Sequence, residues 1–324
     1  MPDSARPTRK NGLSPPYTPA QISTWVLLPF LVLGFLFFVS PILPLAASIP
    51  CTILFVLSAI ASIYHGYMAM YIDPSDPRLL NANHSNNQNQ SGRGNGACEN
   101  CYVDPEEPTK QCWICDVQVG EKSMHCKFCN KCVDHFDHHC MWLNTCVGKA
   151  NYSYFFRTMV CILIMLLIQA IIQVFLIVAI YVGIGEVKRR ALEWFSVNTT
   201  TPVVVGMGIF LLFDLVSISL IGQLLIFHLK LQKEGITTYQ FIVRDNKNRR
   251  ERTKKESDLK LRRKSAIERA KEEGNKCLLF RLENGGFLRE KCGLSCFDPL
   301  SLDEETTENN NSTDANAQSN GAPY

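Results

Sequence analysis

The sequence predicts an all-α polytopic membrane protein with four transmembrane helices and a cysteine-rich domain between the second and the third. Three observations lead to this fold class. Apolar runs occupy two stretches, 22–72 and 153–228, and a dense cluster of cysteine and histidine lies between them. Lysine and arginine gather after the last apolar run, although the net charge of the whole chain is only +3. A chain that is 46% hydrophobic and has polar ends is typical of a membrane protein.

The first apolar stretch, 22–72, is almost free of charged residues. A transmembrane helix needs about twenty apolar residues, so this stretch is long enough for two of them. Three prolines, Pro41, Pro44 and Pro50, are expected to mark the break, because proline disrupts a helix. The sequence therefore predicts a transmembrane hairpin with spans at about 22–39 and 46–71.

Residues 73–111 are expected to form a linker. They begin with Asp73-Pro74-Ser75-Asp76-Pro77, a turn-rich exit from the membrane, and continue through 81–97, which is rich in Asn, Ser, Gln and Gly. Cys98 and Cys101 form a CxxC pair at the end of this linker. By spacing alone, this pair is an alternative to Cys112 and Cys115 as a source of metal ligands.

The domain at 112–152 carries the strongest signal in the chain. Residues 112–146 contain seven cysteines and four histidines. Cysteine pairs two residues apart, followed closely by more Cys and His, have the spacing of zinc ligands, because a tight turn brings both thiolates to one tetrahedral ion. Eight of these side chains are enough for two closed four-coordinate zinc sites.

Backbone alternation suggests how the eight ligands are shared. His125 and Cys126 are neighbours, so in an extended backbone their side chains point to opposite sides and serve different ions. The two sites are then interleaved. We assign one zinc ion to Cys112, Cys115, His125 and Cys132, and the other to Cys126, Cys129, His139 and Cys146. This assignment leaves Cys140 without a metal.

The same alternation suggests a chemical role for Cys140. If His139 turns toward zinc, His138 and Cys140 share the opposite face, where the imidazole can take the thiol proton. Asp137 can hold that imidazole. A free thiol is only slightly ionised near neutral pH, so a nucleophilic cysteine needs such a base or a lowered pKa.

At these residues the chain resembles the DHHC-type protein S-acyltransferases, or palmitoyltransferases. The pattern HCxxCNKCV followed by FDHHCxWLN resembles the subgroup in which the residue after the catalytic Cys is not proline, and that residue is Met141 here. The matching residues are Cys112, Cys115, His125, Cys126, Cys129, Cys132, Asp137, His138, His139, Cys140, Trp142, Asn144, Cys146, Val147, Gly148, Asn151 and Phe155.

The resemblance implies a two-step transfer. Cys140 would attack the thioester of a long-chain acyl-CoA such as palmitoyl-CoA, and the acyl group would then pass to a cysteine of a membrane-associated protein substrate. His138 would be the general base and Asp137 the residue that orients it, while Trp142 would form a hydrophobic wall for the acyl chain. The two zinc ions would be structural, which agrees with a ligand count that leaves no position open for water.

The second apolar stretch, 153–228, predicts another hairpin, with spans at about 155–185 and 201–228. Residues 186–200 are expected to be a short polar loop. With four spans, the tail at 1–21, the cysteine-rich domain and the tail at 229–324 face one side of the membrane. The basic residues of the last tail make that side cytosolic, although Lys188, Arg189 and Arg190 in the opposite loop count against this orientation.

Both tails are expected to be largely disordered, the first being polar and without the features of a signal peptide. Thr237-Thr238-Tyr239-Gln240 resembles the Thr-Thr-x-Glu motif of the family, with glutamine in the acidic position, which we expect to weaken its hold on the cysteine-rich domain. Residues 244–273 predict a helix that either lies along an anionic membrane surface or is simply solvated. Cys277, Cys292 and Cys296 are either acylated or plain thiols.

Other functions compete with that of a transferase. Zinc modules often only bind a partner, but membrane spans on both sides and the lack of an interleaved aromatic and basic surface argue against nucleic acid. A membrane scaffold with little turnover is the alternative suggested by Met141 and Gln240. A transporter lacks support, because Asp214 is the lone charge deep in the last span. We expect a protein of endomembranes, the ER or Golgi, or of the plasma membrane.

Overall fold

The computed structural model describes residues 7–88, 108–275 and 279. The chain divides into two compact units, Met1–Gln240 and Phe241–Tyr324, and each is described by itself. Within the described residues, four helices are long and apolar enough to cross a membrane, and all of them lie in the first unit. These spans are Pro19–Ile42, Leu45–Tyr71, Tyr152–Val182 and Thr201–Glu234.

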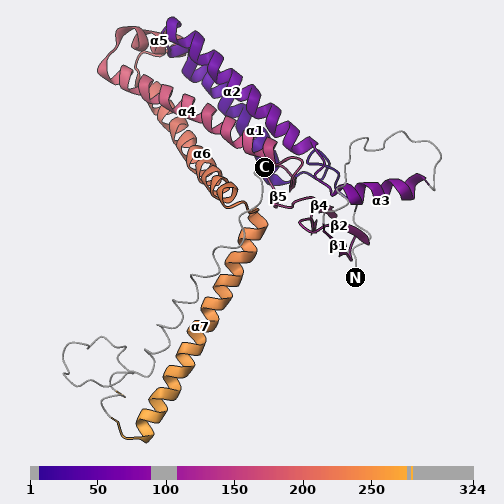
Figure 1. The fold of residues 1–324 in the computed structure, drawn as a ribbon. Helices are drawn as coiled ribbons and strands as arrows, with labels where there is room; N and C mark the ends of the chain where they lie inside the picture. Colours follow the sequence, from indigo (N-terminus) through magenta and orange to yellow (C-terminus); the bar gives the residue numbers. More distant parts are fainter. Residues whose placement is uncertain (1–6, 89–107, 276–278, 280–324) are drawn as a thin grey trace. The chain divides into compact units, whose positions relative to one another are not determined.

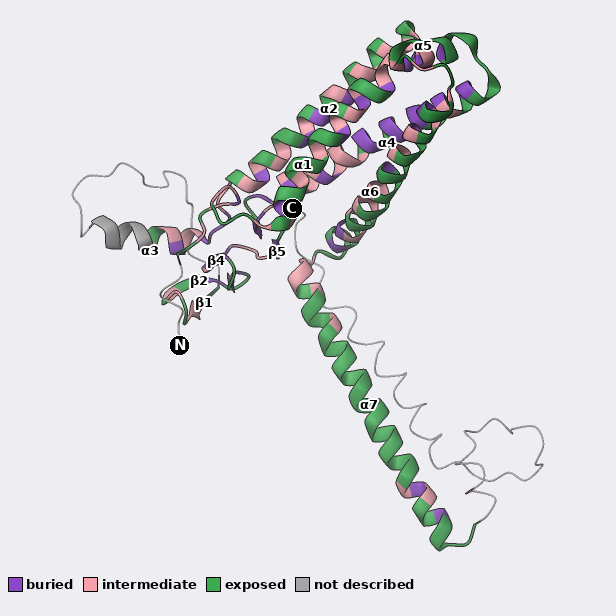
Figure 2. Cartoon of the chain, turned by 180° about the vertical axis from the view of Figure 1, so that it is seen from behind, coloured by how far each residue is buried: buried purple, intermediate pink, exposed green. Residues whose placement is uncertain are grey.

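The four spans form one bundle (Figure 1). Helix α1 (Pro19–Gly34) continues through a π-helical turn and a 3₁₀ turn, and α2 (Leu45–Tyr71) returns beside it. Helix α4 (Tyr152–Val182) packs against both α2 and α6 (Thr201–Glu234). Buried side chains line the inner faces of the bundle, whereas its outer faces carry exposed apolar residues, as expected for helices surrounded by lipid (Figure 2).

The break between the first two spans is shorter than the prolines suggested. It falls between Ile42 and Leu45, so Pro41 lies just before it and Pro44 lies within it, as expected. Pro50, however, lies inside α2, and the expectation that it marks the break is wrong. A proline removes only one backbone donor, and near the start of a long helix the remaining turns carry the structure.

The segment expected to be a polar loop after the third span is a helix, α5 (Gly185–Phe195). Its apolar side is short, because only Val187 and Ala191 are buried, and they join the core of the bundle. Two polar side chains fasten it to the turn between the first spans. Arg190 Nε donates to the carbonyl of Pro41 at 3.2 Å, and Trp194 Nε1 donates to that of Phe37 at 2.9 Å.

A buried polar cluster joins α4 to α6 inside the bundle. Gln169 Nε2 donates to both carboxylate oxygens of Asp214 at 3.0 Å, and Gln173 Nε2 donates to one of them at 2.9 Å. All three side chains are fully buried. Hydrogen bonds between spans hold helices together where water cannot compete, so this cluster fixes α4 against α6.

We predict that Asp214→Leu destabilises the protein by about 1–2 kcal/mol, because it leaves the amides of Gln169 and Gln173 without their acceptor. Thermal unfolding in detergent measures this loss. Asp214→Asn keeps an acceptor and is expected to lose less, and Leu215→Ala, at an exposed position of the same helix, is the control. Equal stability of Asp214→Leu and the unmutated protein would contradict the prediction.

The all-α prediction omits three small hairpins in the cysteine-rich region. Strands β1 (Thr109–Cys112) and β2 (Val117–Gly120) form the first, β3 (Met124–Cys126) and β4 (Lys131–Val133) the second, and β5 (His138–Cys140) and β6 (Thr145–Val147) the third. Each is antiparallel. They are too short to show a strand period in the sequence.

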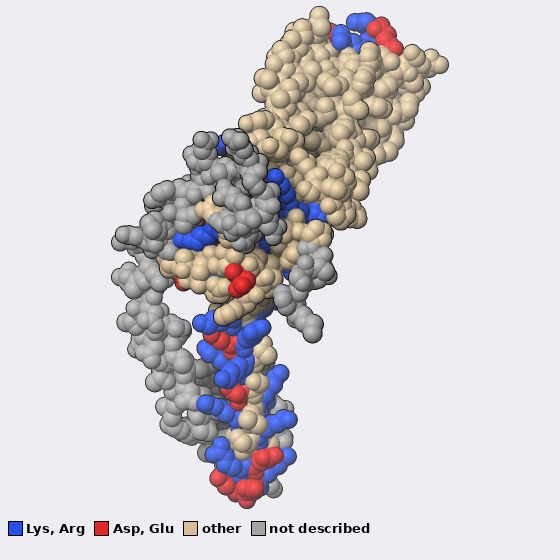
Figure 3. All heavy atoms as spheres, turned by 90° about the vertical axis from the view of Figure 1, so that its right-hand side faces the viewer, with Lys and Arg blue, Asp and Glu red and all other residues tan. Residues whose placement is uncertain are grey.

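Part of the expected linker is also helical. Helix α3 (Pro77–Gln88) covers its beginning, while Cys98 and Cys101 lie outside the described residues. Helix α7 (Thr238–Glu272) is largely exposed beyond Gln240, with only Ala266 and Ala270 buried. Figure 3 shows basic and acidic side chains mixed along it, in contrast to the mostly uncharged surface of the spans. Cys277, Cys292, Cys296 and the end of the chain lie outside the described residues.

Candidate active site and metal centres

The donor atoms of the cysteine-rich region form two groups, each within 4.8 Å of one another. They are Cys112, Cys115, His125 and Cys132 in one group and Cys126, Cys129, His139 and Cys146 in the other. These are the two quartets expected from the sequence. Pairing across the hairpins brings His125 opposite Cys132 and His139 opposite Cys146.

The spacing within each quartet suits a zinc-sized ion. The sulfurs of Cys115 and Cys132 are 3.7 Å apart, and those of Cys129 and Cys146 are 3.5 Å apart. His139 Nδ1 lies 3.4 Å from the sulfur of Cys129. Tetrahedral zinc with three thiolates and one imidazole requires separations of about 3.5–3.8 Å between ligand atoms. The residues present therefore fit a closed four-coordinate ion.

The quartets follow an internal repeat of the sequence. Shifting every residue of the first quartet by 14 positions gives the second one. The tight turns repeat as well, since Asp116, Asn130 and Asn144 all have positive φ, a conformation that Asp and Asn tolerate. The third hairpin has the same pairing, with Cys140 opposite Thr145 as Cys126 is opposite Lys131.

The repeat explains why Cys140 belongs to neither quartet. It occupies the position of Cys112 and Cys126, the first ligand of each quartet. The three ligands that would complete its own site are missing, because the corresponding positions hold Leu143, Ser153 and Val160. Cys140 is thus held in the same turn as a metal ligand while its sulfur belongs to neither quartet.

The thiol of Cys140 lies where the third hairpin meets the membrane helices. Its side chain is 7% exposed and packs with Ala69 at the end of α2 and with Phe155 and Met159 of α4. One wall of the thiol is therefore built from apolar residues of the spans. Its neighbour Trp142, expected as a wall for an acyl chain, is 56% exposed.

Asp137 and His138 form a pair next to this thiol. His138 Nδ1 lies 2.7 Å from Asp137 Oδ2. Burial alone would lower the pKa of His138, but its hydrogen bonds with Asp137 and Cys140 outweigh burial and raise that pKa to about 9. An imidazole with a raised pKa is a stronger base toward the thiol proton. From the alternation of side chains along a strand, we expected Asp137, His138 and Cys140 to lie together. In the structure Asp137 is paired with His138, and His138 and Cys140 lie on the same strand, β5.

The start of α7 holds Asp137 from the other side. Thr238 donates to its two carboxylate oxygens, through the backbone nitrogen and through Oγ1, both at 2.8 Å. Burial would raise the pKa of Asp137, yet the hydrogen bonds from His138 and Thr238 keep it below its usual value. The positive end of the helix dipole favours the same ionised form.

Gln240, which stands in the acidic position of the motif, supports this helix start. Its Oε1 accepts from the backbone nitrogen of Thr237 at 3.0 Å, and its own backbone nitrogen donates to Thr237 Oγ1 at 3.2 Å. This reciprocal pair is a capping box, in which Gln serves as well as Glu. The Thr-x-x-Gln pattern of such a box is present in the sequence at residues 237–240.

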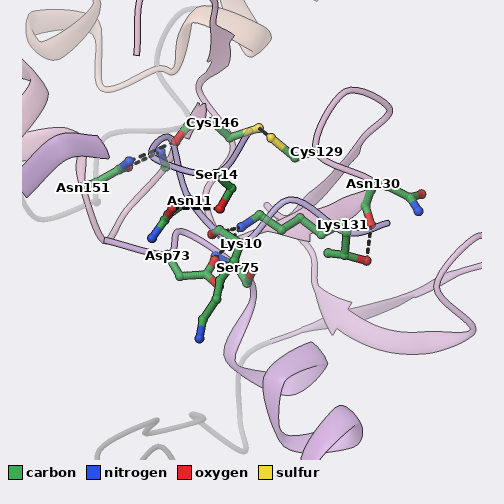
Figure 4. A network of polar contacts seen from close by, with 12 residues as sticks. Lys10, Asn11, Ser14, Asp73, Ser75, Cys129, Asn130, Lys131, Cys146 and Asn151 are labelled. Atoms are coloured by element: carbon green, nitrogen blue, oxygen red, sulfur yellow. Dashed lines mark hydrogen bonds and ion pairs between the residues drawn. The ribbon is translucent and has the colours of Figure 1, made fainter. Parts of the chain in front are cut away.

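The turn after α2 also docks on the cysteine-rich region (Figure 4). Lys131, only 1% exposed, donates to Asp73 Oδ1 at 2.6 Å and to the carbonyl of Lys10 at 2.8 Å. Asp76 Oδ2 accepts from the backbone nitrogen of Gly120 and from Ser123 Oγ. The turn at residues 73–76 therefore connects the spans to the hairpins through hydrogen bonds. The expectation that a plain linker begins at residue 73 is wrong.

Asn151 makes a similar connection at the start of α4 (Figure 4). Its Nδ2 donates to the carbonyls of Ala69 and Cys146, both at 2.9 Å, and its Oδ1 accepts from the nitrogen of Gly148. A Cβ on Gly148 would lie 2.5 Å from the carbonyl oxygen of Asp134, so only glycine fits that approach. These contacts fix the third hairpin against α2 and α4.

We predict that Thr238→Val slows the acylation of Cys140 about tenfold. Valine preserves the shape but loses the hydroxyl that donates to Asp137, so the carboxylate holds His138 less firmly. Single-turnover labelling of the purified protein measures the rate, and metal content is the control, because Thr238 belongs to neither quartet. An unchanged rate would show that the backbone donor alone is sufficient.

Comparison with known proteins agrees with these features. Residues 105–245 match the family model described as DHHC palmitoyltransferase. The protein named Palmitoyltransferase ZDHHC1 from Danio rerio is 32% identical over 259 residues, which cover 73% of this chain and 43% of that relative. This chain therefore spans less than half of the relative's length.

Proposed function

The chain belongs to the DHHC palmitoyltransferase family through residues 105–245, and on this premise we propose that it is a protein S-acyltransferase. One observation carries the proposal. Cys140 is held in the turn of a metal ligand, its sulfur belongs to neither quartet, and it shares strand β5 with His138, which is paired with Asp137. A structural cysteine needs neither an adjacent base nor freedom from the metal.

In the first step, His138 takes the proton of the Cys140 thiol as the sulfur attacks the carbonyl carbon of an acyl-CoA thioester. The bond from that carbon to the CoA sulfur breaks, and the CoA thiolate receives the proton back from His138. Asp137 keeps Nδ1 of the imidazole engaged, so the other ring nitrogen faces the thiol. The product is an acyl thioester on Cys140.

In the second step, the thiol of a protein substrate attacks the same acyl carbon. His138 again removes the proton of the attacking thiol and returns one to the departing sulfur of Cys140. The acyl group ends on the substrate cysteine and the free enzyme is regenerated. No water is needed in either step, and the apolar wall of Ala69, Phe155 and Met159 helps to keep it out.

Both metal sites are proposed to hold structural zinc. Each quartet provides three thiolates and one imidazole, and zinc bound in the second quartet would cross-link the hairpin that carries His138 and Cys140 to the preceding hairpin. The protein residues alone carry out the acyl transfer.

The position of Cys140 beside the ends of α2 and α4 supports an acyl chain that lies among the spans while the CoA headgroup stays in the cytosol. Trp142 is proposed to contact that chain. We also propose the cytosolic orientation given by the basic tail, and the domain limits drawn from the sequence other than the plain linker at 73–111. The proposed location is in endomembranes, the ER or Golgi, or in the plasma membrane. Membrane proteins with cytosolic cysteines would be the substrates.

The test is transfer by the purified protein in detergent. Incubation with labelled palmitoyl-CoA should give an adduct on the protein that hydroxylamine removes, and a cysteine-containing peptide added afterwards should acquire the label. The same peptide with serine in place of cysteine is the control. Absence of both adduct and transfer would overturn the proposal and favour a membrane scaffold.

A further inference from the structure

The active-site imidazole has a neighbour that the reaction above does not use, His228. It lies near the end of α6, and its side chain is only 1% exposed. Its ring centroid is 5.9 Å from that of His138, and a donor atom of its ring lies within 4.8 Å of donor atoms of Asp137 and His138. A second imidazole, fully buried, therefore stands against the partly buried His138 and its partner Asp137.

Side chains from α4 hold His228 in place. Tyr152 Oη lies 3.3 Å from Nδ1 of His228, a distance at which the hydroxyl can donate to the ring nitrogen. The ring of Phe155 meets that of His228 edge to face, with centroids 5.1 Å apart, and it contacts His138 in the same way at 5.5 Å. His138 is thus enclosed between Phe155 and His228.

This arrangement matters because His138 is otherwise fixed at one point. Asp137 holds Nδ1 of the ring but leaves the ring free to tilt about that contact. Packing of Phe155 and His228 on two sides of His138 prevents its ring from tilting. These rings also take the place of water, and the lower local dielectric strengthens the hydrogen bond between Asp137 and His138. Small displacements of a reacting group cost large factors in rate.

We propose that His228 is a positioning residue for acyl transfer, which aligns His138 with Cys140 and is itself oriented by Tyr152; this rests on the proposed function. It would make α6 a direct contributor to the site. The same helix leads to Thr238, so the α6 region would hold both members of the pair, His138 through His228 and Asp137 through Thr238.

The experiment compares His228→Phe with His228→Asn, which keeps an acceptor for the hydroxyl of Tyr152. The acylation of Cys140 is measured at increasing palmitoyl-CoA. We expect His228→Phe to lower the maximal rate about 10- to 100-fold with less than about a twofold change in KM, and His228→Asn to recover part of the loss. Leu229→Ala, at an exposed position of α6, is the control and should behave as the unmutated protein.

A double-mutant cycle identifies the role of Tyr152. Tyr152→Phe should cause a smaller loss of the same kind, and combining it with His228→Phe should add little, because both variants remove one interaction. Full additivity of the two losses would contradict the coupling. Wild-type rates in His228→Phe, or an effect on KM alone, would overturn the proposal.

A second measurement separates this inference from the proposed function. The rate at which iodoacetamide alkylates Cys140 near neutral pH reports the thiolate that His138 generates, and it requires no acyl-CoA. We expect His228→Phe to slow alkylation while the metal content stays unchanged. If the unmutated protein forms no acyl adduct, the proposed function fails, yet unequal alkylation rates would still support the role of His228; equal rates would refute it.

Discussion

Replacing Cys140 with serine is expected to lower acyl-adduct formation by about 10³-fold or more while leaving both metal sites filled. A serine hydroxyl is a far weaker nucleophile than a thiol beside a base, so the first step fails. Because the sulfur of Cys140 belongs to neither quartet, the hairpins keep their ligands. Hydroxylamine-sensitive labelling measures the first effect and elemental analysis of zinc the second.

Cys161→Ser is a matched control for this experiment. Cys161 is another thiol of the membrane region, on α4, and it has no part in either quartet. Its replacement should leave the rate of labelling unchanged. Labelling of Cys140→Ser at the rate of the unmutated protein would contradict the assignment of the nucleophile.

Replacing Cys129 with alanine is expected to remove the metal of the second quartet and to abolish acylation as well. Cys129 is fully buried, and its quartet includes His139 and Cys146, which lie on the same hairpin as Cys140. Structural zinc in such sites contributes about 10–16 kcal/mol of binding free energy, so the hairpin loses its main cross-link. Zinc content measures the loss of the metal, thermal unfolding measures the loss of stability, and acyl labelling measures the loss of activity.

Cys112→Ala provides the comparison. It belongs to the first quartet, whose ligands lie on the first two hairpins and not on the third. We expect it to lose one zinc ion but to retain more acylation than Cys129→Ala does. A larger loss of activity in Cys112→Ala than in Cys129→Ala would contradict the view that the second quartet holds the catalytic turn.

The spans and the two quartets could be predicted because their causes are local. About twenty apolar residues in a row specify a span, and a one-residue step in an extended backbone separates His125 from Cys126. The capping box of Gln240 and the 14-residue repeat were equally visible in the sequence. The repeat in particular shows directly that Leu143 stands where a second ligand would be.

The remaining features depend on contacts between distant residues. Lys131 meets Asp73, Thr238 meets Asp137, and His228 meets His138 only once the helices have packed. An isolated histidine in an apolar run gives no sign of its partner. Helix α5 was missed for a different reason. Val187 and Ala191 stand four residues apart, as on one face of a helix, but the three basic residues between them suggested a polar loop.

Native mass spectrometry of the purified protein, before and after incubation with palmitoyl-CoA, tests the central claim most directly, because it counts bound zinc and bound acyl groups on the same molecule. If the sulfur of Cys140 carries the acyl group and takes no part in coordination, the acylated protein should retain two zinc ions. Acylated molecules that have lost a zinc ion would show that a ligand sulfur, rather than Cys140, had reacted.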